Sequence, residues 1–270
     1  MSTGTRTAML ARLNPLTKII AVAPVVLFTA LTTDPWSPLG MLVFTTALLI
    51  IGGRVPVKRL AKIGLPMLLL FTGYAILYPL VVRQELVNHS PLVLQWRSIR
   101  IYEAGLMFGF ATGLRIISLI SLSLLFTLTS DFTDFIRALV QQWKLPVKIG
   151  YGTMTALRFI PFIQSELKVI EHAHRIRGVS ARKGIKTFGD KLRMYSVPLL
   201  SGAIRRAERS ALAMDARGFA WPENRTYYRK MTFHRIDAGF AIGFWLICAV
   251  YFYVLSSAGL MGSLVVFQGI

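Results

Sequence analysis

Five apolar stretches, separated by polar segments, alternate along this chain. They cover roughly residues 17–33, 39–51, 63–82, 104–129 and 237–255. A helix needs about 20 apolar residues to cross the roughly 30 Å of hydrocarbon in a bilayer, and several of these stretches approach that length. We therefore predict an all-α integral membrane protein with about five transmembrane helices.

The segment 130–235 lies between the fourth and fifth stretches and is patterned differently. A helix is predicted at about 135–143, because the polar residues 130–134 can cap its start and Pro146 stops its end. Two longer helices are predicted to follow. Periodicity therefore predicts two or three amphipathic helices here, beside the transmembrane set.

Both longer helices are predicted to end at an Arg-Gly pair. In the first, five apolar residues and a histidine recur in steps of four and three residues and form one helical stripe. These positions are Ala156, Ile160, Ile163, Leu167, Ile170 and His174. Pro161 should kink this helix. The second helix is predicted to start near residues 187–192 and to be divided by Pro198. Its many small residues predict a close crossing with the first.

Charge orients these elements in the membrane. The net charge is +19, and residues 130–235 hold 20 Lys and Arg against 8 Asp and Glu. Segment 53–62 holds four basic residues and no acidic one, whereas 34–38 holds no basic residue. Cytoplasmic loops carry an excess of Lys and Arg. We therefore predict 53–62, 130–235 and the N-terminus inside, and 34–38, 83–103 and the uncharged C-terminal tail outside. The basic charge then indicates a lipid bilayer as partner and not a nucleic acid.

Pattern and charge together predict three parts. Residues 1–129 form a membrane bundle of four spans with the N-terminus inside, residues 130–235 are cytosolic, and residues 236–270 hold the last span and an outside tail. No cleavable signal is expected, because basic residues lead directly into the first apolar stretch without a convincing cleavage site.

The fourth apolar stretch carries a small-residue face and a charge. Gly105, Gly109 and Gly113 recur every fourth residue, which lets another helix approach closely. That helix belongs either to the same bundle or to a partner membrane subunit. Arg115 lies well inside the stretch, where a charge is costly unless it is paired or wet. It is expected to meet backbone carbonyls or a polar group of a partner.

Asp131 and Asp134 form a DxxD pattern with two interpretations. They cap the helix that follows, or they bind Mg²⁺ and a diphosphate as in some membrane prenyl-transfer enzymes. The second interpretation makes the chain a Mg²⁺-dependent enzyme acting on a lipid or prenyl diphosphate. It lacks a second acidic motif, so capping is favoured.

Other catalytic patterns are missing from the sequence. It contains no G-x-x-x-x-G-K-[ST] phosphate loop, and His172 and His174 are not spaced as a helical metal pair. Cys248 is the single cysteine, which leaves no disulfide or thiol metal cluster. We expect no catalytic residue, cofactor or metal. The spans also lack the charge series of an ion pathway, although a self-sufficient channel or carrier stays open as an alternative.

The two Arg-Gly pairs are the candidate functional residues. They are Arg177-Gly178 and Arg217-Gly218, 40 residues apart. Each is a good helix stop, because arginine suits the C-terminal dipole and glycine caps without a Cβ penalty. An arginine at a rigid helix end also suits a two-pronged bond with a carboxylate in a partner's groove. Two copies in one segment favour the partner interpretation.

At these residues the chain resembles the transmembrane component of energy-coupling factor (ECF) importers, the family that includes the membrane subunit of cobalt uptake systems. The resemblance covers nearly the whole chain. It rests on Leu13-Asn14-Pro15-Leu16-Thr17-Lys18, Leu114-Arg115, Leu128-Thr129-Ser130, Leu157-Arg158-Phe159-Ile160-Pro161, both Arg-Gly ends and, most specifically, Ala213-Met214-Asp215-Ala216-Arg217-Gly218-Phe219.

The resemblance implies a scaffold in a prokaryotic cell membrane, with cytosolic coupling helices. Their ends would dock in grooves of two ABC-type ATPases, through Arg177 and Arg217 with the neighbouring residues Ile176, Gly178, Ala216 and Gly218. The ATPase activity would then reside in the partners. A small substrate-capture membrane subunit would choose the substrate, a vitamin or a transition-metal ion.

Overall fold

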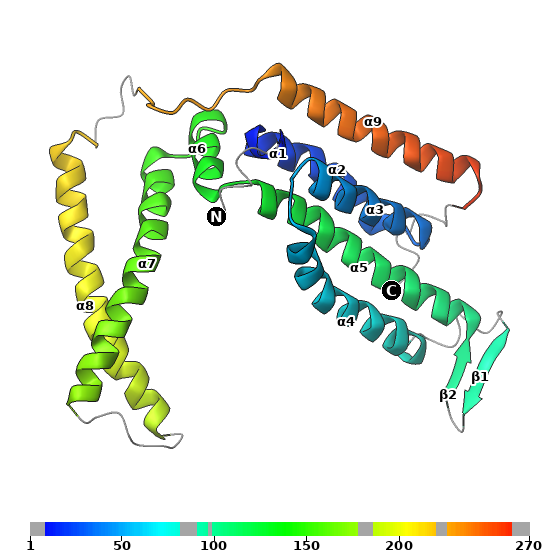
Figure 1. The fold of residues 1–270 in the computed structure, drawn as a ribbon, viewed down its shortest axis with the longest axis horizontal. Coiled ribbons are helices and arrows are strands. Elements are labelled where there is room, and N and C mark those ends of the chain that lie inside the picture. The colour runs from blue at the N-terminus through cyan, green and yellow to red at the C-terminus, as the bar shows by residue number, and fades with distance from the viewer. Residues whose placement is uncertain (1–8, 82–90, 97–98, 178–185, 220–225, 261–270) are drawn as a thin grey trace. The chain divides into compact units, whose positions relative to one another are not determined.

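The computed structural model describes residues 9–81, 91–96, 99–177, 186–219 and 226–260. The chain divides into two units, and Figure 1 shows its course through them. Met1–Gln142 and Met231–Ile270 form the first, which we call the bundle. Trp143–Lys230 forms the second, which we call the helix pair. The helix pair is therefore an insertion between two parts of the bundle sequence.

The bundle is built from the predicted apolar stretches. Its elements are α1 (Met9–Arg12), α2 (Pro15–Leu31), α3 (Trp36–Ile51), α4 (Val57–Val81), β1 (Leu92–Trp96), β2 (Ile99–Tyr102), α5 (Glu103–Thr129), α6 (Phe132–Gln142) and α9 (Arg235–Ser257). Helices α2, α3 and α4 pack on α5, while α9 packs on α2 and α3. The core between them includes Ala21, Val25, Met41, Leu49, Leu122, Leu125, Phe244 and Cys248. Helix α6, grouped with the cytosolic helices in the sequence analysis, packs on α2 and falls in the bundle.

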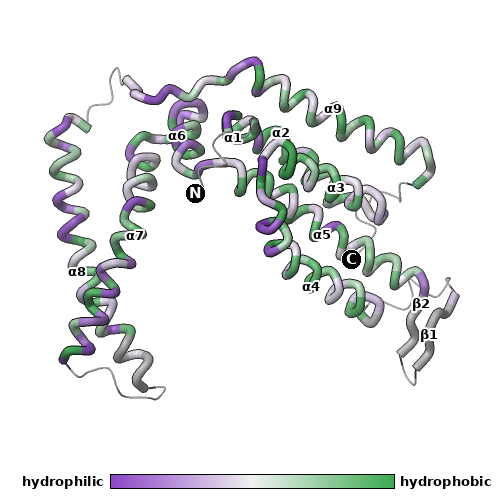
Figure 2. The backbone as a smooth tube through the Cα atoms, viewed as in Figure 1, coloured by the Kyte–Doolittle hydropathy of each residue, from purple (hydrophilic) through white to green (hydrophobic). Residues whose placement is uncertain are grey.

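The predicted all-α membrane class is confirmed. Helices α4, α5 and α9 are long and apolar enough to cross a membrane, judged by length and composition, and Figure 2 shows them mainly in hydrophobic colours. Helices α2 and α3 are also apolar but have 17 and 16 residues, which corresponds to about 25 Å of helix. The count of five spans therefore stays a prediction for the two shorter helices.

A β-hairpin lies between α4 and α5, where sequence analysis predicted a loop. Strands β1 and β2 pair antiparallel, with Leu94 opposite Ile101 and Trp96 opposite Ile99. The strands contain Val, Ile, Tyr and Trp, which favour strands. They have 5 and 4 residues, and runs this short show no clear period in the sequence.

Helix ends of the bundle alternate between two sides. The amide of Leu10 in α1 donates to the carbonyl of Gly52 just after α3 (3.2 Å), so the N-terminal end of the bundle and the end of α3 share one side. At the other ends, the hydroxyl of Tyr251 in α9 donates to the carbonyl of Trp36 at the start of α3 (2.7 Å). Such alternation is what a topology of successive spans requires. Which side faces the cytoplasm stays a prediction from the charges.

The helix pair is antiparallel. Its helices are α7 (Val147–Ile176) and α8 (Lys186–Ala216). Near the start of α7 the ring of Tyr151 lies edge-on to that of Phe219, just after α8, with centroids 5.7 Å apart. Near the end of α7 the ring of His174 meets that of Tyr195 in the first third of α8, also at 5.7 Å. The start of each helix therefore lies beside the end of the other.

The crossing of α7 and α8 predicted from small residues is confirmed. A Cβ built on Gly202 would lie 3.0 Å from Oε1 of Glu166, so Gly202 of α8 faces the side chain of Glu166 in α7. One turn further, the guanidinium carbon of Arg206 lies 3.2 Å from the ring centroid of Phe162. Arg206 is half-buried here, and such a cation–π contact contributes about 0.5–2 kcal/mol, depending on how far the cation is removed from water.

The prediction that Pro198 divides the last helix of this segment is wrong. Helix α8 runs unbroken through Pro198, as α7 does through Pro161. A proline removes one backbone donor. Contacts with α7 lie on both sides of Pro198: the ring of Tyr195 meets that of His174, and the guanidinium of Arg206 lies over the ring of Phe162.

Candidate functional site

The end of α7 carries the first predicted docking arginine. Arg177 occupies the C-cap, where its amide donates to the carbonyl of Ala173 (3.1 Å). The side chain of Arg177 is exposed, and the neighbouring Ile176 is 87% exposed. We call these two residues the Arg177 tip. Gly178, predicted to close this end, lies outside the described residues.

The end of α8 carries the second arginine in a well-defined cap. Gly218 has a φ of +71°. Its amide donates to the carbonyl of Asp215 (2.9 Å), and the amide of Phe219 donates to the carbonyl of Met214 (3.0 Å). This pair of bonds is the Schellman motif, and it requires the left-handed backbone that glycine adopts freely. Arg217 stands at the C-cap with its side chain exposed. We call Ala216, Arg217 and Gly218 the Arg217 tip.

The two tips lie at opposite ends of the helix pair. Both close the C-terminal ends of antiparallel helices, and the 30 residues of α7 correspond to about 45 Å. Within the described parts of the chain, neither guanidinium has a hydrogen bond or ion pair. Each is available for a two-pronged bond to a carboxylate of another protein, and the spacing is too large for one small groove to take both.

The glycine face of α5 meets α4 of the same chain. A Cβ on Gly109 would lie 3.3 Å from the carbonyl oxygen of Ala75, and one on Gly113 would lie 2.8 Å from Cδ2 of Phe71. Gly105 is also buried. At Gly109 and Gly113 the close approach is therefore made inside the bundle, which is the first of the two alternatives considered from the sequence.

Arg115 lies half-buried in the same helix, and its Nε is buried without a hydrogen-bond partner among the described residues. Its guanidinium is within electrostatic range of Tyr78 in α4 and of Asp34, between α2 and α3. Asp34 is 4% exposed. Sequence analysis did not single out Asp34, because nothing in the sequence relates this turn to the middle of α5.

Asp131 and Asp134 have local structural roles. Oδ1 of Asp131 accepts from the amide of Thr133 (2.8 Å), and the carbonyl of Asp131 accepts from the amide of Phe135 (3.0 Å). Asp134 forms an ion pair with Arg137 one turn on (2.8 Å). This is the capping interpretation of the DxxD pattern.

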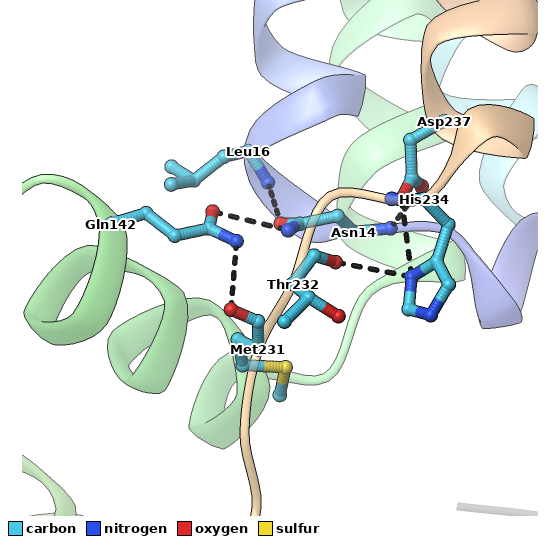
Figure 3. A network of polar contacts seen from close by, with 7 residues as sticks. All are labelled: Asn14, Leu16, Gln142, Met231, Thr232, His234 and Asp237. Carbon is cyan, nitrogen blue, oxygen red and sulfur yellow. Dashed lines mark hydrogen bonds and ion pairs between the residues drawn. The ribbon is translucent and has the colours of Figure 1, made fainter.

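A polar cluster that sequence analysis did not predict joins helix ends of the bundle. Asn14 lies at its centre (Figure 3). Its Oδ1 accepts from the amide of Leu16 (3.1 Å) and caps α2, and its Nδ2 donates to Oε1 of Gln142 at the end of α6 (3.1 Å). The amide of Asn14 donates to Oδ1 of Asp237 in the first turn of α9 (2.8 Å). We call Asn14, Lys18, Gln142 and Asp237 the joint.

The two charges of the joint are buried, and each has hydrogen-bond partners. Lys18 is 0% exposed, and its Nζ donates to the carbonyl of Thr129 (2.8 Å) and to Oγ of Ser130 (3.1 Å) at the end of α5. Asp237 is 3% exposed and accepts from the amide of His234 (2.8 Å). The cation sits at a helix C-terminus and the anion at a helix N-terminus, where each is favoured by the helix dipole. The sequence offered one signal for this cluster: Lys18 and Asp237 are charged residues at the edges of apolar stretches, where a buried charge needs a partner.

Comparison with known proteins identifies the family. The profile of the family described as cobalt transport protein, CbiQ, matches residues 6–228. The energy-coupling factor transporter transmembrane protein EcfT of Bacillus subtilis (strain 168) is 31% identical over 258 residues, covering 92% of this chain and 94% of the relative. EcfT of Limosilactobacillus fermentum (strain CECT 5716 / Lc40) is 30% identical, covering 92% and 93%. This chain therefore belongs to the family of transmembrane components of energy-coupling factor transporters.

Membership settles the coarse function predicted from the sequence. As a transmembrane component of ECF transporters the chain is a transport subunit in a membrane, and the resemblance predicted from its motifs is confirmed. The alternative of a prenyl-diphosphate enzyme gains no support from the family, and Asp131 and Asp134 already have structural roles.

Proposed function

We propose that this chain is the non-catalytic coupling subunit of an ECF-type importer. In this proposal α7 and α8 are cytosolic coupling helices, and each tip docks on one of two ABC-type ATPases that hydrolyse ATP. The bundle lies in a prokaryotic cell membrane and binds a small capture subunit. The substrate is a vitamin or a transition-metal ion, and the description of the matching family as cobalt transport proteins favours the metal.

The observation that carries this proposal is the placement of the two arginine tips. They are exposed, they lie at opposite ends of one antiparallel pair, and each has an uncovered small or aliphatic neighbour, Ala216 or Ile176. A chain with one cytosolic partner has no need of two matching ends about 45 Å of helix apart. Two copies of one ATPase, each offering the same groove, fit this arrangement.

The chemistry of docking follows from the side chains. Guanidinium groups form paired, planar hydrogen bonds with carboxylates that a lysine ammonium cannot reproduce. At the Arg217 tip the Schellman cap fixes the direction in which the chain leaves α8, so the arginine is presented on a rigid end. We therefore expect an acidic residue in a groove of each ATPase, opposite Arg177 or Arg217.

The test is co-purification of the chain with its ATPases. Arg177→Ala combined with Arg217→Ala should abolish ATPase association, while the membrane part still elutes as a folded species from size exclusion. Arg193→Ala is the matched control, because Arg193 is exposed on α8 away from its C-terminal end. The double variant Arg177→Lys, Arg217→Lys keeps both positive charges but loses the paired hydrogen bonds of the guanidinium groups, so it should bind the ATPases weakly. A double alanine variant with full ATPase stoichiometry would overturn the proposal.

A further inference from the structure

Two opposite charges lie inside the bundle, between α3 and α5. Asp34, in the turn before α3, is 4% exposed, and Arg115 is half-buried in α5. The two helices pack on each other (Figure 1), and the two side chains lie within electrostatic range. Oδ1 of Asp34 and Nε of Arg115 are nevertheless both buried without a hydrogen-bond partner among the described residues. The charges therefore face one another without a direct bond through these atoms.

Two buried hydroxyls accompany the charges. Ser37 and Ser118 are both 0% exposed, and within the described part of the chain neither hydroxyl has a hydrogen-bond partner. Ser37 lies in the first turn of α3, where its amide donates to Oδ2 of Asp34 (2.7 Å). Ser118 follows Arg115 by three residues and so shares its face of α5. We call Asp34, Ser37, Arg115 and Ser118 the polar site.

The polar site departs from the usual rule for buried polar atoms. About nine in ten such atoms have a hydrogen-bond partner, and a charge in an apolar span is costly unless it is paired or wet. The start of α3 favours the ionised form of Asp34, because a helix N-terminus attracts an anion. Both charges are therefore retained, and the four unpartnered atoms require a ligand.

The chemistry of the polar site selects that ligand. A cation at Asp34 would be repelled by Arg115, and an anion at Arg115 would be repelled by Asp34. The guanidinium donates, the carboxylate accepts, and a hydroxyl does both. A buried water takes two to four such partners, and it bridges polar groups that are too far apart for a direct hydrogen bond. Water is the ligand that suits this neutral set.

We propose that Asp34 is the counter-charge of Arg115, and that water held by Ser37 and Ser118 bridges the two across α3 and α5. The bridged pair fixes the turn between α2 and α3 against the middle of α5. It assigns Arg115 to the fold of the bundle and not to a partner subunit, which the sequence had left open. The inference does not depend on the coupling function proposed above.

The first experiment is a double-mutant cycle on the full chain, followed by thermal unfolding in detergent. Asp34→Asn and Arg115→Gln each leave one buried charge unpaired, so each should lower the unfolding midpoint. The double variant leaves neither charge and should lose clearly less than the sum of the two single losses. Glu103→Gln combined with Arg115→Gln is the matched control. Glu103 is the exposed carboxylate at the start of the same helix, and these two losses should add.

Three outcomes of this cycle would overturn the pairing. The first is additive losses for Asp34→Asn and Arg115→Gln. The second is an Arg115→Gln variant that keeps the parent's midpoint but no longer co-purifies with a capture subunit, which would assign Arg115 to the partner. The third applies if a single variant fails to fold: the other substitution should then restore folding, and a double variant that stays unfolded contradicts the pairing.

The second experiment detects the bridging water by nuclear magnetic resonance of the ¹⁵N-labelled chain in micelles. The Nε–H signal of Arg115, identified by its loss in Arg115→Gln, should show a cross-relaxation peak with water. The indole N–H of Trp245 donates to the carbonyl of Ala21 (3.0 Å) and is the internal control, for which no such peak is expected. Absence of the arginine–water peak, or an equal peak at Trp245, would overturn the water bridge.

Discussion

The bundle and the helix pair bury their residues in opposite ways. Helix α5 has buried residues along its whole length and packs on α2, α3 and α4. In the helix pair, Gly150 is the one buried residue among those that the structure describes. The bundle supplies its own core, whereas α7 and α8 hold each other mainly at their crossing. A unit with so little core is suited to move and to be covered by partners or lipid.

The largest loss of stability is expected when the buried Lys18 is replaced. Lys18→Met removes the ammonium that bonds the end of α5 and takes its positive charge away from the buried Asp237. Breaking one side of a buried charged arrangement costs about 3–5 kcal/mol. We expect that loss in the free energy of unfolding of the bundle, measured by thermal unfolding in detergent. Lys168→Met on the exposed face of α7 is the control. An equal loss of stability in that variant would contradict the expected difference between a buried lysine of the bundle and an exposed lysine of the helix pair.

A leucine pair compares the two units directly. Leu122 in α5 is 0% exposed and Leu212 in α8 is 69% exposed. Leu122→Ala should leave a cavity that costs about 2–5 kcal/mol. Leu212→Ala should change the stability of the isolated chain by less than about 0.5 kcal/mol. The same unfolding assay measures both, and similar losses would show that the helix pair has a core of its own.

The α4–α5 contact should be sensitive to a single methyl group. A Cβ on Gly113 meets Phe71 at 2.8 Å, whereas one on Gly73 meets nothing within 4 Å. Gly113→Ala should therefore destabilise the bundle by about 1–3 kcal/mol through overpacking, and Gly73→Ala should be neutral in thermal unfolding. If Gly113→Ala kept full stability but lost a capture subunit in co-purification, the face would belong to the partner.

The smallest effect is expected at the Arg217 tip. Gly218 has a φ of +71°, which costs a residue with a Cβ about 1–2 kcal/mol. Gly218→Ala should fray the end of α8 and weaken ATPase binding about 5–30-fold, with the bundle unaffected. Titration of purified ATPase onto the chain measures the change. Gly152→Ala, where a Cβ meets nothing, serves as control, and equal affinities for both variants would show that the cap does not present Arg217.

The sequence determined the parts of this protein that depend on local pattern. Apolar length placed α2, α3, α5 and α9 close to their observed bounds, whereas α4 begins at Val57, inside the basic segment 53–62 that was predicted as a loop. The steps of three and four residues predicted α7, small residues predicted its crossing with α8, and Gly218 predicted the helix stop. Each of these follows from the period of a helix or from the conformational freedom of one residue type, so neighbouring residues are enough to predict it.

The tertiary structure alone decided what distant residues do to one another. Asn14 and Asp237 are 223 positions apart, and periodicity does not say which buried carboxylate will accept from which amide. The opposite placement of the two arginine tips also follows from the antiparallel contacts of α7 and α8 and not from either motif. Hydrogen bonds must be satisfied wherever the fold brings donors and acceptors together, and that meeting point is a property of the packed chain.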